Sequence, residues 1–182
     1  TRQVSSAASD VYKRQNSNLG KIGLAISPFD STILYAAVET DRRNGAVYKT
    51  TNSGGSWLKM SDTVSGATGP HYYQELVASP HVFDKIYLMD TKVQVSENGG
   101  KDFYIMNESD KHVDNHSLTF KMSDPNYLLI GTDGGVYESF DDTNSWKFVA
   151  NLPLTQFYKL AVDDAYPFYN IFGGTQDNNL SL

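Results

Sequence analysis

The chain has 182 residues, 13% of them aromatic, and it contains 12 tyrosines and 14 glycines. This length suffices for one domain with a sizeable core, and the composition suits many short strands joined by tight turns. The formal net charge is −6 and the basic residues are scattered, so nucleic acid is not expected as a partner. The absence of cysteine excludes a disulfide framework and a thiolate metal site, and no apolar run is long enough to predict a membrane span.

The first 15 residues, TRQVSSAASDVYKRQ, differ in character from the rest of the chain. They lack the apolar stretch of a signal peptide, and they resemble the translated adapter sequence found at the ends of open reading frames from environmental sequencing. We therefore expect residues 1–15 to be a non-native or disordered tail. The folded part is expected to cover residues 16–182.

Beyond this tail the chain contains four pairs of short runs that are typical of β-strands. The pairs are IGLAISP and TILYAAVE, QELVASP and KIYLMDT, HSLTFKMSDP and YLLIGTD, and finally YKLAVDD and YNIFGGT. A polar turn with a proline separates the two runs of each pair. No segment shows a helical period over 11 residues, so we predict an all-β fold.

An eight-residue pattern follows each of the first three pairs. It occurs as TTNSGGSW from Thr50, SENGGKDF from Ser96 and SFDDTNSW from Ser139, with starts 46 and 43 residues apart. A third strand leads into each pattern and a fourth begins at its aromatic residue, which gives four short antiparallel strands per repeat. Such a repeat at this spacing is typical of a β-propeller blade. A β-sandwich is the alternative, but it does not require the same turn at a fixed interval.

We therefore predict a partial β-propeller of about three and a half four-stranded antiparallel blades. The blades are expected over residues 20–62, 70–108 and 112–152, with a partial blade over residues 156–182. In each eight-residue pattern we expect a structural role for side chains that bond the backbone of the turn, for glycines with positive φ, and for the aromatic residue, which packs between sheets. These residues are Asn52, Gly54, Trp57, Asn98, Gly100, Phe103, Asp141 and Trp146. A sugar or calcium site in these turns is the disfavoured alternative.

The three patterns resemble the Asp boxes of the BNR/Asp-box propeller superfamily, which includes sialidases, xyloglucanases and sortilin-type sorting receptors. The segments PHYYQELVASPHVFDKIYLMDT, KHVDNHSLTF, GTDGGVYESFD and NLPLTQFYKLAVDDAYPFYNIFGGTQDNN resemble a family of large bacterial BNR-repeat proteins, commonly described as glycosyl hydrolases or sortilin N-terminal-domain proteins. This resemblance covers about residues 20–182. It implies a secreted, periplasmic or cell-envelope parent protein with further blades, of which this chain is an internal piece packed against the remaining blades.

The order of strands predicts where a ligand binds. In an up-and-down blade, the linker into the first strand and the turn between the second and third strands emerge on one face. The polar segments KHVDNH, GTDGG and GTQDNN belong to these connections, so we expect them around the mouth of the central channel, which we term the rim. A glycan or a protein or peptide ligand is expected there. The candidate ligand-binding residues are His71, Tyr72, His112, His116, Gln176 and Asn178.

The rim also holds three aspartates, Asp114, Asp133 and Asp177, that are candidates for catalysis. A glycosidase needs a carboxylic acid of raised pKa and a second carboxylate about 5 to 10 Å away. The stretch GTDGGVY around Asp133 is similar to a Thr-Asp-x-Gly-Gly-x-Tyr stretch that carries a catalytic aspartate in xyloglucanases, although one residue before the glycines is missing here. An ordinary Asp-Gly hairpin turn is the alternative interpretation. A binding module and a xyloglucanase-like glycoside hydrolase therefore both stay open.

Two other chemistries are disfavoured. His112, Asp114 and His116 occupy alternate positions, so an extended chain would point all three to one face, as a zinc or iron site requires. Three ligands on one strand strain the coordination angles, however, and we expect ordinary hydrogen bonding and no cofactor. A sialidase clamps its substrate with several converging arginines, whereas Arg42 and Arg43 are neighbours on one turn.

Overall fold

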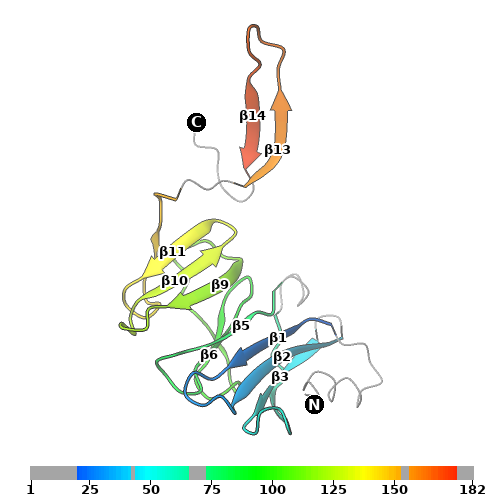
Figure 1. Cartoon of the computed structure of the whole chain (residues 1–182), viewed down its shortest axis with the longest axis vertical. Helices are drawn as coiled ribbons and strands as arrows, with labels where there is room; N and C mark the ends of the chain where they lie inside the picture. Colours follow the sequence, from blue (N-terminus) through cyan, green and yellow to red (C-terminus); the bar gives the residue numbers. More distant parts are fainter. Residues whose placement is uncertain (1–19, 42–43, 66–72, 153–155, 176–182) are drawn as a thin grey trace, which may run out of the picture.

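A computed structural model of the chain describes residues 20–41, 44–65, 73–152 and 156–175 (Figure 1). This described part forms 14 strands and no helix, which confirms the all-β prediction. It therefore contains no helix of the length and apolar character needed to cross a membrane.

The strands form three four-stranded sheets and one hairpin, each antiparallel and each with its strands in chain order. The first sheet contains β1 (Ile22–Ile26), β2 (Leu34–Asp41), β3 (Asn44–Thr50) and β4 (Leu58–Ser61). The second contains β5 (Leu76–Ala78), β6 (Ile86–Leu88), β7 (Gln94–Ser96) and β8 (Tyr104–Ile105). The third contains β9 (Asn115–Phe120), β10 (Leu128–Thr132), β11 (Gly135–Ser139) and β12 (Lys147–Phe148). The hairpin is β13 (Phe157–Val162) and β14 (Ile171–Thr175), so the prediction of a partial propeller with three and a half blades is confirmed.

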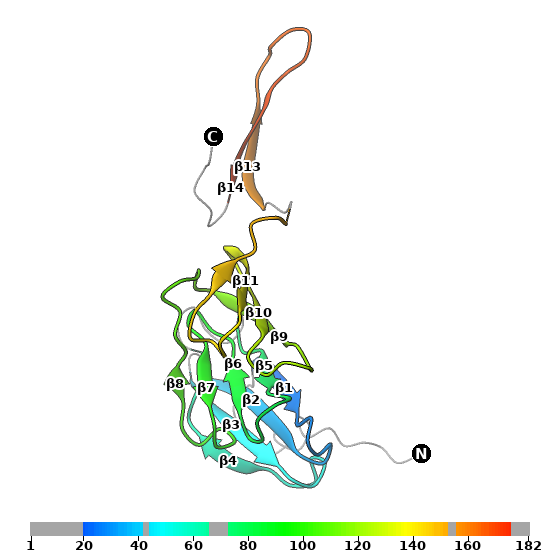
Figure 2. The ribbon, with the colours of Figure 1, turned by 90° about the vertical axis from the view of Figure 1, so that its left-hand side faces the viewer.

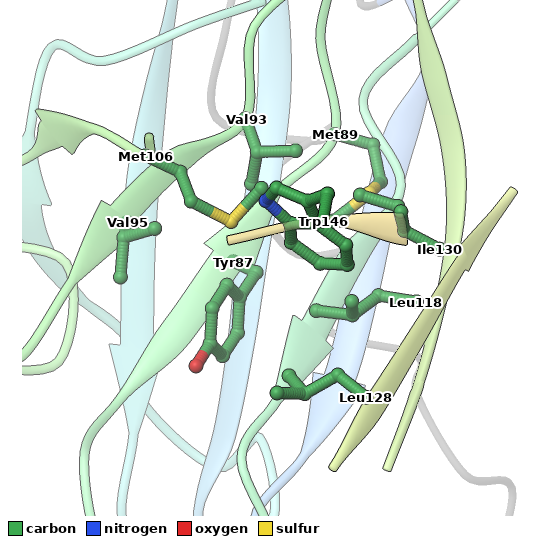
Figure 3. Packing of buried hydrophobic residues seen from close by; sticks show 9 residues of the cluster. All are labelled: Tyr87, Met89, Val93, Val95, Met106, Leu118, Leu128, Ile130 and Trp146. Atoms are coloured by element: carbon green, nitrogen blue, oxygen red, sulfur yellow. The ribbon is translucent and has the colours of Figure 1, made fainter. Parts of the chain in front are cut away.

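The hydrophobic core lies in the two seams between neighbouring blades. One cluster joins the first and second blades through Ala25, Ile33, Tyr35, Ala37, Val47, Leu76, Ile86 and Leu88. The other joins the second and third blades through Tyr87, Met89, Val93, Val95, Met106, Leu118, Leu128, Ile130 and Trp146. Figure 3 shows Trp146 in the middle of this second cluster, with Val93 and Met106 on one side and Ile130 and Leu118 on the other. Because each blade buries an apolar face against the next, the three sheets pack face to face in chain order, as successive blades of a propeller do.

The eight-residue patterns form three turns of the same geometry, which we term the box turns (residues 50–57, 96–103 and 139–146). In the second turn the Ser96 hydroxyl accepts the Gly100 N–H at 2.9 Å and donates to Asn98 Oδ1 at 3.0 Å. Asn98 Oδ1 also accepts the Asp102 N–H at 3.0 Å. The same three bonds recur in the other two turns, around Thr50, Asn52, Gly54 and Ser56 and around Ser139, Asp141, Thr143 and Ser145.

Two successive residues of each box turn have positive φ. Glycine supplies this conformation at Gly54, Gly99 and Gly100, as expected from its missing Cβ. The third turn has no glycine, and Asp142 and Thr143 adopt φ values of 50° and 73° instead. A β-branched residue in this region is strained, so Thr143 holds the third turn in shape at a conformational cost that Gly54 and Gly100 avoid at the equivalent position, although Ser53 of the first turn also has a φ of 56°.

The hairpin β13–β14 stands apart from the three sheets in both views of the chain (Figures 1 and 2). Large apolar side chains are exposed along both of its strands. They are Phe157, Tyr158, Leu160, Val162, Ile171 and Phe172. Among the described residues, no further blade covers these apolar side chains in the way that neighbouring blades cover β2 and β6.

Candidate functional site

The rim is built where the second and third blades meet, and backbone hydrogen bonds fix its segments. The Asp114 N–H donates to the Thr91 carbonyl at 2.8 Å, and the Asn115 N–H donates to the Asp90 carbonyl at 3.0 Å. The Asp133 N–H in turn donates to the Asp114 carbonyl at 3.1 Å. The linker into β9 is therefore held between the β6–β7 turn and the β10–β11 turn, as the blade topology predicts.

Four side chains from three segments meet at this seam, and we term them the rim cluster: Tyr73, Asp114, His116 and Asp133. The Tyr73 hydroxyl donates to Asp114 Oδ1 at 2.6 Å, and His116 Nε2 lies 2.8 Å from Asp133 Oδ1. The Tyr73 and His116 rings are stacked, with centroids 5.3 Å apart and an angle of 17° between their planes. The two rings are thus in contact, and the polar atom of each ring is bonded to the carboxylate of a different aspartate.

Burial and exposure divide the cluster into an inner and an outer half. Tyr73 is 2% exposed, whereas the side chains of His116 and Asp133 are 35% and 23% exposed. Burial, aided by the hydrogen bond to Asp114, raises the pKa of Tyr73 to about 12, so its phenol remains a donor at neutral pH. In the part of the chain that the structure describes, the second oxygen of each carboxylate has no hydrogen-bond partner, so both can accept bonds from a ligand.

His112 does not share a metal-binding face with Asp114 and His116. The extended backbone that such a metal site would need over residues 112–116 is not formed, because β9 begins only at Asn115 and Asp114 has a φ of 62°. The His112 ring instead packs on Gly134, where an added Cβ would lie 2.5 Å from the ring, and its Nδ1 lies 2.7 Å from the Val113 carbonyl oxygen. Within the described ranges no three histidine, aspartate or glutamate side chains are grouped to hold a metal ion.

A buried ion pair beneath the rim was missed by the sequence analysis. Lys111 and Glu108 have side chains 0% and 4% exposed, and Lys111 Nζ lies 3.1 Å from Glu108 Oε1. Asn115 connects this pair to the rim, because its amide donates to Glu108 Oε1 at 3.1 Å and to the Thr91 carbonyl at 2.9 Å. Burial lowers the pKa of Lys111, while Glu108 opposes that shift. The pair therefore anchors the linker that presents His112 and Asp114.

Several predicted site residues cannot be placed. His71, Tyr72, Gln176, Asp177 and Asn178 all lie outside the described residues. Tyr73, the neighbour of Tyr72 in the same linker, is the residue that joins the cluster. The missed pair Glu108 and Lys111 carries only a weak signal in the sequence, a Glu-x-x-Lys spacing that is common on exposed surfaces.

Comparison with known proteins supports the fold. No family model and no curated protein matches the chain. Among solved structures, the GH74 enzyme of Niastella koreensis is similar with 15% identity and a TM-score of 0.60, and the GH74 xyloglucanase of Xanthomonas campestris with 20% identity and a TM-score of 0.56. Each match covers 77% of this chain and 24% of the other, so the chain spans about a quarter of the length of either enzyme. YCF48 bound to D1 peptide is similar over 92% of this chain and 56% of that one, with 10% identity and a TM-score of 0.50. At these identities the likeness shows a shared β-propeller fold.

Proposed function

We propose that the chain is a ligand-binding propeller module that holds a glycan or a peptide at the rim. The observation that carries this proposal is the rim cluster, in which the pairs Tyr73–Asp114 and His116–Asp133 are brought together from three segments that are distant in the sequence. Each carboxylate keeps one oxygen for a ligand while the other oxygen is fixed by its partner. Such preorganised acceptors suit the hydroxyls of a sugar and the N–H groups of a peptide.

The solved neighbours are compatible with either ligand. One is a xyloglucanase and another was solved with a bound peptide. The repeated box turns also support membership of the BNR/Asp-box superfamily, and with it an exported parent protein whose further blades pack against this chain. These features together favour a module that binds outside the cytoplasm.

A glycoside hydrolase is the second candidate, because Asp114 and Asp133 lie on the same rim. In that case one carboxyl would protonate the leaving oxygen and the other would act as base or nucleophile. Binding is the better supported function, since both carboxylates are already bonded to the stacked pair of Tyr73 and His116.

The proposal is tested by screening the full chain against a glycan array and a peptide library, followed by calorimetry on the strongest ligand. Asp133→Asn is expected to weaken binding at least about tenfold, because a bond to a charged acceptor is worth about 1.5 to 3 kcal/mol. Asp124→Asn, on the opposite face of the same blade, is the matched control and should bind normally.

The same samples separate the two candidates. Release of sugar by the wild type, lost in Asp133→Asn and Asp114→Asn while binding persists, would establish the hydrolase. Ligand that binds the rim variants and the wild type equally, with no difference in sugar release between them, would show that neither candidate uses this cluster.

A further inference from the structure

Three buried side chains beneath the rim form a group whose chemistry goes beyond that of an ion pair. The side chains of Lys111 and Glu108 are 0% and 4% exposed, and Asn115 is 0% exposed. Lys111 Nζ lies 2.5 Å from Asn115 Oδ1 and 3.1 Å from Glu108 Oε1. Glu108 Oε1 also accepts a hydrogen bond from Asn115 Nδ2 at 3.1 Å. An amine, a carboxamide and a carboxyl group are thus in mutual contact and shielded from water.

The surroundings of this group favour the uncharged forms of the amine and the acid. A buried ion pair loses the hydration of both charges, and a buried oxygen without a partner adds to that cost. Glu108 Oε2 is such an oxygen among the described residues, and Lys111 Nζ lies 5.8 Å from the centre of the Trp146 ring. Burial lowers the pKa of Lys111. Transfer of one proton from the ammonium to the carboxylate removes both charges and gives Lys111 a nucleophilic lone pair.

We propose that Lys111 and Asn115 become joined by an isopeptide bond, in a reaction that the folded chain carries out on itself. The lone pair of Lys111 Nζ forms a bond to Asn115 Cγ, and the π electrons of the side-chain carbonyl move to Oδ1. When the carbonyl re-forms, the bond from Cγ to Nδ2 breaks and this nitrogen leaves as ammonia. Atoms and electrons balance without any further reactant.

Glu108 lies where the reaction requires a proton carrier. Its Oε1 is 3.1 Å from the attacking nitrogen of Lys111 and 3.1 Å from the departing nitrogen of Asn115. Glu108 gives Nδ2 the proton that it received from the ammonium, and it takes the surplus proton from Nζ as the new amide forms. The carboxyl group of Glu108 ends the reaction as a neutral acid, which suits its buried position.

The backbone of the rim holds the reacting atoms close together. Asn115 opens β9, and its N–H donates to the Asp90 carbonyl at 3.0 Å while its side-chain amide donates to the Thr91 carbonyl at 2.9 Å. Because a carbonyl bond is about 1.23 Å long, Lys111 Nζ lies within about 3.7 Å of the carbon that it attacks. Groups held at this separation react far faster than the same groups free in solution. The product is a covalent ring over residues 111–115, which locks the linker into β9.

The intact mass of the full chain tests whether the bond forms. After folding and incubation at neutral pH, the wild type should be lighter than its encoded mass by one molecule of ammonia. Glu108→Gln keeps the shape of the side chain but carries no proton, and Lys111→Met removes the nucleophile, so both variants should keep their encoded masses. Circular dichroism confirms that the samples are folded. A folded wild type with its encoded mass overturns the proposal, and loss of ammonia from Glu108→Gln overturns the role of Glu108.

Peptide mapping separates this bond from closure of an asparagine side chain on its own backbone, which also releases ammonia. Trypsin cleaves after a free lysine, so the wild type should stay uncut after Lys111 and give a peptide in which Lys111 and Asn115 are linked, whereas Glu108→Gln should be cut there. Lys49 is the internal control: its side chain is 15% exposed, it pairs with Asp84 at 2.7 Å, and it should be cut normally. Ammonia loss together with normal cleavage after Lys111 contradicts the proposed bond.

Discussion

The Tyr73 hydroxyl shows how a single residue couples packing to the chemistry of the rim. Its ring is buried between two blades and stacks on His116, so the position of the phenol is set by the core. Its oxygen donates to Asp114, whose positive φ turns that carboxylate toward the tyrosine. Tyr73 therefore positions two candidate site residues, Asp114 through a hydrogen bond and His116 through ring stacking.

Tyr73→Phe is expected to lower the free energy of unfolding by about 1 to 2 kcal/mol at pH 8, because Asp114 loses a hydrogen bond in a partly buried site. The pKa of Tyr73 rises from its usual 10 to about 12 on folding, so this stabilisation is present below pH 10 and is lost as the pH rises through 12. The difference in the free energy of unfolding between the wild type and Tyr73→Phe, measured by urea unfolding, should thus become smaller as the pH rises from 10 to 12. Tyr166→Phe, at an exposed residue, is the control. If the difference in the free energy of unfolding stays constant up to pH 12, the hydrogen bond from Tyr73 to Asp114 does not contribute to stability as expected.

At the scale of the element, the box turns show which parts of the structure a sequence can predict. Their hydrogen bonds join residues at most four apart, so eight letters contain all the partners that fix the turn. The strand pairs were predictable for the same reason, since apolar runs and turn residues are local signals. The rim cluster was only partly predictable, because Tyr73 and His116 are 43 residues apart and meet through the stacking of blades. The turn of the backbone at Asp114, which removes the alternation that a metal site at His112 and His116 would need, has only a weak local signal, namely that aspartate adopts positive φ more readily than most residues.

Two substitutions at the same position of two box turns, one removing a glycine and one introducing it, test whether the positive φ at this position affects stability. Gly100 has a φ of 96°, and an added Cβ would lie 2.6 Å from Val47 Cγ1. Gly100→Ala should therefore destabilise the chain by about 1 to 3 kcal/mol through strain and overlap. Thr143 occupies the equivalent position with a φ of 73°, so Thr143→Gly should stabilise the chain by up to about 1 kcal/mol. Calorimetric melting of both variants measures the two effects, and shifts of the same sign would show that φ does not control these turns.

At the scale of the whole molecule, each seam is closed by the same kinds of contact. Lys49 of the first blade pairs with Asp84 of the second at 2.7 Å, and Lys85 of the second pairs with Asp142 of the third at 3.3 Å. Beside the second seam, the Trp146 indole donates to the Asn107 carbonyl at 3.0 Å, in the loop that follows the preceding blade. A box turn therefore has two roles, since it shapes its own blade and supplies an aromatic residue to the blade before it.

The two tryptophans occupy the same position in the first and third box turns, and this provides a matched test of the seam. The Trp57 indole N–H is buried and has no hydrogen-bond partner among the described residues, whereas that of Trp146 is bonded within the core cluster. Trp146→Phe removes a bond, leaves the Asn107 carbonyl unpaired and opens space in the seam, so a loss of about 1 to 3 kcal/mol is expected. Trp57→Phe removes a donor that bonds nothing, and its effect should lie within about 0.5 kcal/mol of zero. Urea unfolding followed by circular dichroism compares them without relying on either indole as the probe. Equal losses in the two variants would mean that the box aromatic stabilises its own blade, and that stacking between blades does not depend on it.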